Sequence, residues 1–416
     1  MARTLGVSVD GSRPSGLIAW AAYPWIVLFA ATLVQTTASF GNQAISPIAP
    51  FLVDDLGVSR QQIGLLVTAS YAGACFILIL AGSLSDRFGV RSLFLGGLVL
   101  AGVPLALEAA MPSFGLLVVP MLAFGLGNGF ALPPTTRAIV EWFPTRRRGL
   151  AMGIKQTGVA LAGMICGVLV PPLATALGWR GAFVALGSIT AAAGVLSWLL
   201  YRERAPEAEI SARPPRPSVG TVLRNRDLLL LSAVTLLYAG VQLSLVGFLV
   251  LFLRERVGMS LIEAGAMLSL AQGGGVVGRI GWGMVSDWLF GGRRKVVIGI
   301  IGVLAAVSAL GLAVVDGETP RLALVGLLAV AGVSAIGWNG INMIFVAEIV
   351  GREASATAAG VNLTASYLGI MICPPIFGWL VDTTGSYTTA FVGGALCSVV
   401  ALALLYQIRA ERTARA

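Results

Sequence analysis

The chain has 416 residues, of which 57% are hydrophobic and 11% are charged, and its formal net charge is +9. Soluble domains are about 45–50% apolar and about 25% charged, so this composition excludes a soluble globular protein and also a disordered chain. The sequence therefore predicts an all-α membrane protein that crosses the bilayer many times.

Twelve apolar stretches are long enough to cross a hydrocarbon core, which takes about 20 residues in a helix. In chain order they cover residues 21–50, 60–82, 92–111, 115–138, 149–174, 180–201, 227–252, 260–283, 295–315, 320–346, 355–381 and 387–407. Polar segments are predicted at both ends, over residues 1–20 and 408–416. The charged, proline-rich segment 202–226 cannot cross a bilayer, so it divides the chain into two six-helix bundles, 21–201 and 227–407.

The two bundles repeat one another in sequence. The run Gly82–Asp86 (GSLSD) recurs as Gly283–Asp287 (GMVSD), and Met152–Lys155 (MGIK) aligns with Ala359–Asn362 (AGVN). Internal repeats of this kind are typical of secondary transporters. The repeat therefore predicts two bundles of the same fold, related by pseudo-symmetry.

The distribution of basic residues predicts which side of the membrane each chain end faces. With the N-terminus inside, 20 of the 28 Lys and Arg residues fall in inner segments, five in outer loops and three within spans. Because positive residues stay in the cytoplasm, both ends are predicted to be cytoplasmic. The charge of +9 then faces the anionic inner leaflet, so the bilayer is an expected partner and nucleic acid is not.

Metal and enzymatic chemistry are not expected from this sequence. The chain has no histidine, and its four cysteines, which lie in apolar spans without C-x-x-C spacing, are expected to be packing thiols. These are Cys75, Cys166, Cys373 and Cys397. Without histidine there is no Ser-His-Asp arrangement, and the glycines match no phosphate-binding loop. We therefore predict a protein that is not an enzyme and needs no cofactor or metal.

A glycine, aspartate and arginine motif, Gly82-x-x-x-Asp86-Arg87-x-Gly89-x-Arg91, connects the second and third spans. Gly82 lets two helices approach closely, and Asp86 can face the positive N-terminal end of a helix in the other half. Such a contact would hold the inner side closed in one state. The alternative interpretation is a topogenic turn whose charges are solvated.

The chain resembles the transporters of the major facilitator superfamily over its whole length. The resemblance lies in its twelve spans, its two repeated halves, its basic central loop and this motif. The resemblance implies alternating access, in which the halves rock about a site in the middle of the membrane. In the second copy of the motif, Trp288 stands where the family has an arginine.

Arg137 and Glu141 have the spacing of a helical ion pair, which is interpreted as part of the inner gate rather than a simple surface pair. The residues expected to act in gating are Gly82, Asp86, Arg87, Arg91, Arg137, Glu141, Gly283, Asp287 and Glu348.

Two further segments resemble the organic-anion branch of this superfamily, which includes oxalate/formate exchangers and monocarboxylate transporters. They are Glu141-Trp-Phe-Pro144 with the nearby Arg148-Gly149 and Gly153, and Gly278-Arg279-x-x-x-Gly283 with Ser286-Asp287. In the monocarboxylate type, an arginine four residues before the glycine of the eighth span binds the carboxylate, and Arg279 has that spacing. Gly275 stands where those carriers often have an acid, and the first span has no lysine, so proton-coupled lactate transport is not implied.

Two cations within spans are candidates for binding an anion. An arginine inside a membrane costs about 2.5–3.5 kcal/mol, so Arg279 is expected to face a cavity or a partner, and its guanidinium can grip a carboxylate with two hydrogen bonds. Lys155 lies at a similar depth in the other half, on a span that adjoins that of Arg279 in the family fold. For both residues the alternative is a side chain that reaches back to the lipid headgroups.

Neutral polar residues in the spans are expected to complete the substrate site, although each could instead bond one helix to another. Those assigned to the site are Gln35, Asn128, Tyr238, Gln242, Asn339, Asn342, Asn362 and Tyr367, and the first span also carries Thr36, Thr37, Asn42 and Gln43. No acid lies deep in a span, the nearest being Glu108 at the outer end of the third. The cavity is therefore expected to be electropositive.

These features together predict a monomeric secondary transporter of the bacterial inner membrane whose substrate is a small organic anion, a monocarboxylate or short dicarboxylate. The main alternative is an exporter of a hydrophobic drug or metabolite, in which a deep carboxylate would be expected. A receptor built on a transporter fold is a third hypothesis, which the lack of an added cytoplasmic domain disfavours.

Overall fold

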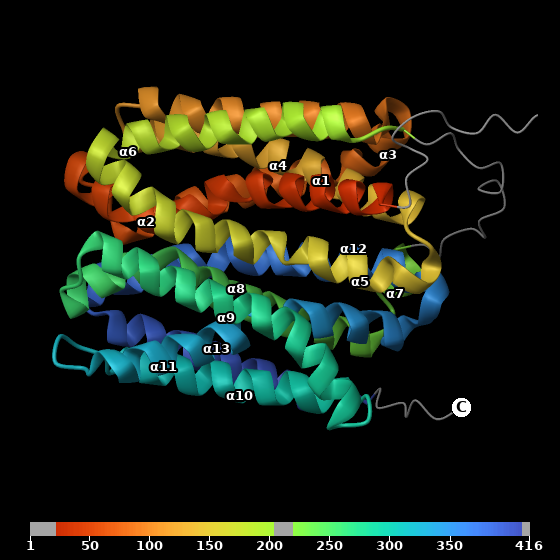
Figure 1. Ribbon diagram of the computed structural model, residues 1–416. Helices are drawn as coiled ribbons and strands as arrows, with labels where there is room; N and C mark the ends of the chain where they lie inside the picture. The colour runs from red at the N-terminus through yellow and green to blue at the C-terminus, as the bar shows by residue number, and fades with distance from the viewer. Residues whose placement is uncertain (1–21, 204–218, 410–416) are drawn as a thin grey trace, which may run out of the picture.

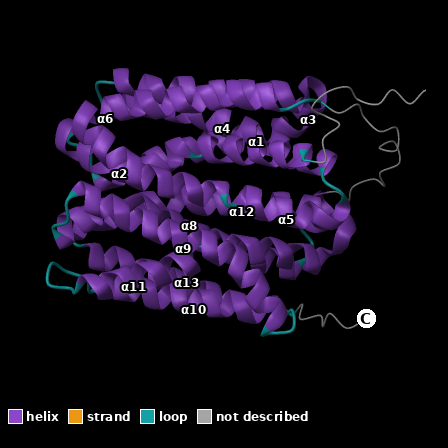
Figure 2. Cartoon of the chain, in the orientation of Figure 1, coloured by secondary structure: helices purple, strands orange, loops and turns teal. Residues whose placement is uncertain are grey.

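The computed structural model describes residues 22–203 and 219–409, which fold into a bundle of helices joined by short loops (Figure 1 and Figure 2). The first range contains α1 (Tyr23–Ala38), α2 (Phe40–Leu56), α3 (Arg60–Leu107), the 3-10 turn η2 (Glu108–Ala110), α4 (Phe114–Trp142), α5 (Thr145–Gln156) and α6 (Gly158–Leu200). The second contains α7 (Val219–Val222), α8 (Arg226–Val257), α9 (Leu261–Trp288), α10 (Arg294–Ala313), α11 (Arg321–Ala331), the π-helical turn η4 (Gly332–Ile336), α12 (Asn339–Thr384) and α13 (Tyr387–Tyr406). These ranges are called the first and second halves below.

Three of the helices are sharply divided by a glycine. Gly89, Gly178 and Gly351 have φ of +75°, +72° and +76° inside α3, α6 and α12. Only glycine adopts this left-handed backbone at little cost, so each residue turns the chain between two helical segments. Gly89 therefore separates the predicted spans 60–82 and 92–111. Gly178 separates the predicted spans 149–174 and 180–201.

Ten helical ranges in the described part of the chain are long and apolar enough to cross a membrane. One of them, Arg146–Leu200, has 55 residues and contains the break at Gly178. The helical stretch from Arg60 to Arg87 comes before another of the ten, Phe88–Ala110, and is not counted among them. These two features leave room for the twelve crossings that the sequence predicts.

The predicted first span, 21–50, corresponds to one candidate span, Tyr23–Leu56, which is broken at Ser39 and extends six residues beyond the predicted end. The hydroxyls of Thr36, Thr37 and Ser39 donate to the carbonyls four residues earlier, at 2.8, 2.9 and 2.8 Å. Such bonds compete with the helical ladder and bend helices. Hydropathy ended this span too early, because the helix continues through its charged end at Asp54 and Asp55.

Predicted helix boundaries were also incomplete at two other places. The predicted span 149–174 is preceded by a further turn and is interrupted at Thr157, between α5 and α6. The predicted span 320–346 contains the π-helical turn Gly332–Ile336, whose extra residue per turn leaves no hydropathy signal.

The two halves lie one above the other in Figure 1 and meet along three pairs of helices. α2 packs against α8, α3 against α12, and α6 against α9. The start of α1, the end of α6, α7 and the end of α13 lie at one end of the bundle, on the right of Figure 1, which is called the terminal end. The opposite end is called the distal end. Both described chain ends are thus on one side, and the sequence predicts that this side is cytoplasmic.

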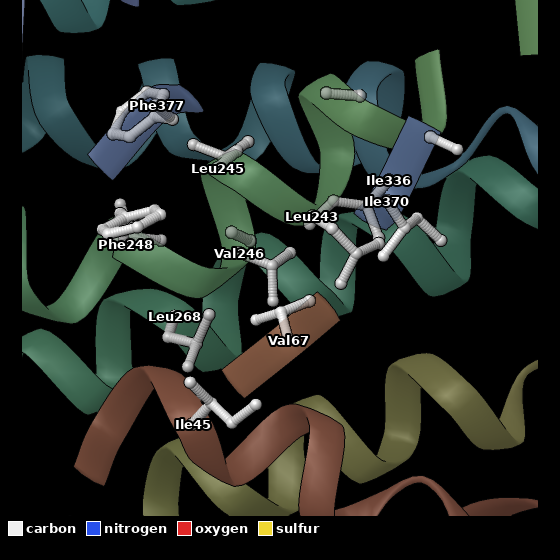
Figure 3. Close-up of a cluster of buried hydrophobic side chains, with 14 of the residues drawn as sticks. Ile45, Val67, Leu243, Leu245, Val246, Phe248, Leu268, Ile336, Ile370 and Phe377 are labelled. Atoms are coloured by element: carbon white, nitrogen blue, oxygen red, sulfur yellow. The ribbon is translucent and has the colours of Figure 1, made fainter. Parts of the chain in front are cut away.

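Apolar side chains from both halves fill the centre of the distal part. Ile45 and Val67 from the first half belong to one buried cluster with Val246, Leu268 and Phe377 from the second (Figure 3). In a membrane, such contacts act through close packing rather than through removal of apolar surface from water. The cluster therefore holds the halves together only while their surfaces match.

Candidate functional site

The two predicted cations lie beside the junction of α5 and α6. Lys155 is next to Gln156, the last residue of α5, and its Nζ donates to the hydroxyl of Thr136 on α4 at 3.0 Å. Arg279 comes from α9 in the other half, and its Nη1 donates to the carbonyl oxygen of Gln156 at 2.9 Å. Arg279 therefore reaches from the second half to the backbone of the residue that follows Lys155, and a shared role of the two cations in binding an anion stays a prediction.

Neither cation has an acidic partner in the part of the chain that the structure describes. Among the described residues, no ion pair involves Lys155 or Arg279, although Lys155 is only 5% exposed. The Nε of Arg279 is buried and has no hydrogen-bond partner. Buried charges and polar atoms are nearly always paired, so Lys155 and Arg279 are the described residues best suited to bind an anion.

An aromatic pair adjoins Arg279 at the interface of the halves. Tyr71 on α3 and Tyr367 on α12 meet edge to face, with ring centroids 5.3 Å apart. The hydroxyl of Tyr71 is close enough to Arg279 for an electrostatic interaction. Tyr367 was predicted for the site, whereas Tyr71 was missed because a tyrosine in an apolar span carries no distinguishing signal.

Gln35 on α1 also borders this junction. It is 4% exposed, its Oε1 is buried without a partner, and a Cβ on Gly158 at the start of α6 would lie 3.0 Å from its Cγ. Asn128 on α4, also predicted, donates from Nδ2 to the carbonyl of Ala38 at 2.8 Å. Asn128 therefore fixes α4 to the break in the first span, and Gln35 keeps a free acceptor near the cations.

A buried pair of amides crosses between the halves nearer the distal end. Gln272 on α9 donates from Nε2 to Oε1 of Gln43 on α2 at 2.8 Å. A Cβ on Gly163 of α6 would overlap the Gln272 amide, so glycine makes room for this side chain. Gln272 was missed, although a glutamine in a glycine-rich span was a visible signal.

Five residues predicted for the site bond within the second half instead. Asn362, which is 0% exposed, accepts from Asn342 at 2.8 Å and donates to Thr235 at 2.9 Å. Gln242 accepts from Trp338 and Asn339, and Tyr238 donates to the carbonyl of Ile298. The structure does not bring these side chains to Arg279 or Lys155 in this conformation.

Replacing Asn362 with alanine is expected to lower the free energy of unfolding by about 1–3 kcal/mol, because it leaves the buried amide of Asn342 without its acceptor. Thermal unfolding of the purified protein measures this loss. Thr364→Ala is the matched control, since Thr364 is exposed on the same helix. A weaker affinity for the substrate without loss of stability would contradict this assignment.

The predicted gating residues form ion pairs within single halves at the terminal end. Arg137 and Glu141 are 2.6 Å apart, which confirms the predicted helical pair. Arg294, which was not predicted, contacts Asp287 at 2.6 Å and Glu348 at 3.2 Å. Glu348 therefore pairs within its own half here, and its role in a gate with the first half stays a prediction.

The remaining gating predictions are only partly described. Arg91 donates from Nε to the carbonyl of Trp198 at 2.8 Å, within the first half. Nothing lies within 4 Å of a Cβ placed on Gly283. The side chains of Asp86 and Arg87, and the surroundings of Gly82, lie outside the described residues.

At the distal end, by contrast, polar contacts join the two halves. Arg254 pairs with Asp54 at 2.9 Å, and Arg60 pairs with Glu255 at 2.8 Å. The carboxylate of Asp382 accepts from the backbone N–H groups of Arg60 and Gln61, at 3.0 and 2.8 Å, and so caps the start of α3. The sequence analysis missed these contacts because they join helix ends that are about 200 or more residues apart in the chain.

Glu108 was predicted near the outer end of the third span, and the structure places it there in η2. It is 0% exposed, and neither carboxyl oxygen has a partner. Glu108 therefore belongs to the distal part of the first half rather than to the group around Arg279.

The protein has two helical halves that meet around buried polar side chains and are joined by ion pairs at one end. This architecture is typical of membrane transporters. The chain belongs to the Major Facilitator Superfamily, whose family model matches residues 31–374. It is a multi-pass protein of the inner membrane, as predicted.

Several curated relatives are similar over most of the chain. A probable sulfoacetate transporter of Cupriavidus necator is 27% identical, over 92% of this chain and 93% of the relative. A hexuronate transporter of Bacillus subtilis is 24% identical, over 88% and 90%. A probable L-galactonate transporter of Escherichia coli is 25% identical, over 86% and 83%. These names do not include an oxalate/formate exchanger or a monocarboxylate transporter, so that closer resemblance stays a prediction.

Solved structures share the fold. A bacterial homologue of the human lysosomal transporter Spinster, in an inward-facing and occupied conformation, has a TM-score of 0.75 at 18% identity, over 94% of this chain and 97% of that one. A D-xylose-proton symporter has a TM-score of 0.75 at 15% identity, over 93% and 98%. At these identities the likeness establishes the fold alone.

Proposed function

We propose that this protein is a secondary transporter that carries a small organic anion across the membrane by alternating access. The observation that supports this most strongly is that Lys155 and Arg279, two cations from opposite halves, both lie at the α5–α6 junction and have no ion-pair partner among the described residues. An anion bound there supplies the missing charge. Sulfoacetate, hexuronate and L-galactonate, named for three relatives, are all organic anions.

The two cations have different tasks in this proposal. The planar guanidinium of Arg279 donates two parallel hydrogen bonds to a carboxylate, while Lys155 adds a point charge held in place by Thr136. Gln35 offers its free Oε1 to a donor on the substrate. Because the cations belong to different halves, the bound anion links them and favours the closed form of the site.

The contacts at the two ends support a direction for the cycle. The halves are tied at the distal end by Arg254 with Asp54 and by Arg60 with Glu255, whereas the ion pairs Arg137–Glu141 and Arg294–Asp287 each lie within one half at the terminal end. With the terminal end in the cytoplasm, the distal contacts close the outer side of the protein. We propose that the distal contacts break when the site opens to the outside, with coupling either by exchange or by a proton carried with the substrate.

Uptake by reconstituted protein tests this function. Proteoliposomes are given radiolabelled galactonate, sulfoacetate, oxalate or a lipophilic cation, with and without unlabelled internal substrate, and with an imposed pH gradient or membrane potential. We expect saturable uptake of at least one carboxylate or sulfonate, and the internal substrate or gradient that accelerates it identifies the coupling. Uptake of the lipophilic cation in preference to every anion would contradict the proposal and favour an exporter of hydrophobic compounds.

A further inference from the structure

The bond between Gln43 and Gln272 lies on the same helical interface as Arg279. Gln272 and Arg279 are both on α9, seven residues apart, which places their Cα atoms about 10 Å apart along the helix. Side chains on a helix lean toward its N-terminus, so both lean toward the distal end and keep this separation. The amide pair therefore lies about two turns beyond the cations, deeper in the bundle.

Each amide of this pair has a polar atom left over. Nε2 of Gln272 and Oε1 of Gln43 bond to each other, which leaves Nε2 of Gln43 as a donor and Oε1 of Gln272 as an acceptor. In the described ranges neither of these two atoms forms a hydrogen bond, and neither atom is fully buried, although Gln43 and Gln272 as whole residues are only 4% and 1% exposed. The pair therefore presents one accessible donor and one accessible acceptor between the halves, which match a group that both donates and accepts.

The chemistry of the two sites differs in a way that selects a ligand. A hydroxyl group both donates and accepts, and so matches the free atoms of the amide pair, whereas an ionised carboxylate only accepts. The carboxylate instead matches Arg279 and Lys155, which only donate. A ligand that satisfies both sites carries an acid at one end and hydroxyl groups along or at the end of its chain.

The spacing sets the length of that ligand. With bonds of about 1.5 Å, a chain of six carbons with its terminal oxygens extends roughly 8 Å, which suits two groups of side chains whose Cα atoms are about 10 Å apart. A two-carbon anion reaches only one of the groups. Length and hydroxylation should therefore both raise affinity.

We propose that Gln43 and Gln272 form a hydroxyl-binding subsite, which selects a hydroxylated organic acid of about six carbons, such as a sugar acid, while Arg279 and Lys155 hold its carboxylate. This proposal rests on the function proposed above and narrows its substrate class. Gly163 contributes by leaving room for the Gln272 amide between the helices. Gln43 and Gln272 are thus specificity-determining residues, and their mutual bond presents the free donor and acceptor side by side.

Binding of three acids to purified full-length protein, measured by isothermal titration calorimetry, tests the subsite. The acids are galactonate, hexanoate, which has the same number of carbons but no hydroxyls, and acetate, which is short. In the natural protein we expect galactonate to bind about tenfold more tightly than either of the others. In the double variant Gln43→Met with Gln272→Met, galactonate should lose about tenfold in affinity, while acetate is unchanged and hexanoate is unchanged or tighter.

The double replacement keeps side-chain volume and leaves no single amide without its partner. Gln407→Met, on an exposed glutamine near the terminal end, is the matched control and should change none of the three affinities. An equal loss for all three acids, or no change for galactonate, would overturn the subsite. If the double variant does not fold, the natural protein still decides, because equal affinities for galactonate and hexanoate would overturn the proposal.

The outcomes separate this inference from the function on which it rests. Binding of all three acids that depends on Arg279, without preference for hydroxyl groups, would overturn the subsite and leave organic-anion transport standing. Failure of the folded natural protein to bind any of the three acids would overturn the subsite, whereas organic-anion transport is overturned only if the uptake panel described above shows no carboxylate or sulfonate as substrate.

Discussion

Replacing Arg279 with alanine is expected to abolish saturable uptake of organic anions while the protein still folds. Arg279 supplies the bidentate contact to the carboxylate, and removing one partner of a buried charge pair costs about 2–5 kcal/mol. The affinity for the anion should therefore fall by about 100-fold or more. Uptake of labelled substrate by proteoliposomes measures the loss, and size-exclusion chromatography verifies the fold.

Two further variants sharpen that result. Arg321→Ala is the matched control, because the Arg321 side chain is 75% exposed at the distal end and pairs with Glu263 there; uptake should be unchanged. Arg279→Lys keeps the charge but loses the planar fork, so it should recover only part of the affinity. Normal transport by Arg279→Ala would remove this residue from the substrate site.

Replacing Gly265 with valine is expected to stop transport by preventing the halves from closing at the distal end. A Cβ on Gly265 of α9 would overlap the carbonyl oxygen of Gly167 on α6 and come within 2.6 Å of the Pro171 ring. Backbone atoms on a facing helix cannot move aside as a flexible side chain can, so the two helices must separate. Uptake in proteoliposomes should fall at least about tenfold, whereas the anion should still bind to the purified protein.

Gly281→Val provides the comparison within the same helix. Among the described residues, no atom from another helix lies within 4 Å of a Cβ at Gly281, so this replacement carries the same local cost to the helix without a clash between the halves. Its uptake should stay near that of the natural protein. Equal uptake by the Gly265 and Gly281 variants would mean that the distal contact of α6 with α9 does not take part in the cycle.

The sequence predicted the fold class and the two cations for clear physical reasons. Long apolar stretches predict membrane-spanning helices, because a helix satisfies its own backbone hydrogen bonds in the bilayer. An arginine inside such a stretch is energetically costly unless it faces a cavity or a partner. The adjacency of Lys155 and Arg279, however, came from the resemblance to a known family. Hydropathy and spacing alone do not say which helices of a bundle are neighbours.

The neutral polar residues were harder to assign. Asn362 aligns with Lys155 in the internal repeat, but the structure buries it against Asn342 and Thr235 within the second half. An amide in a membrane helix gains from any hydrogen-bond partner, whether a neighbouring helix or a substrate, and its presence in the sequence does not distinguish the two. Gln272, in contrast, was not predicted for the site. Its partner Gln43 lies 229 residues away in the chain, so the sequence does not show that the two amides meet.

The account rests on the claim that an organic anion lies between Lys155 and Arg279, and an experimental structure determined with bound galactonate tests it most directly. We predict density for the carboxylate within hydrogen-bond distance of the Arg279 guanidinium, with Lys155 beside it and the hydroxylated chain directed toward Gln43 and Gln272. Galactonate bound with its carboxylate away from both cations, or bound elsewhere in the protein, would contradict the account.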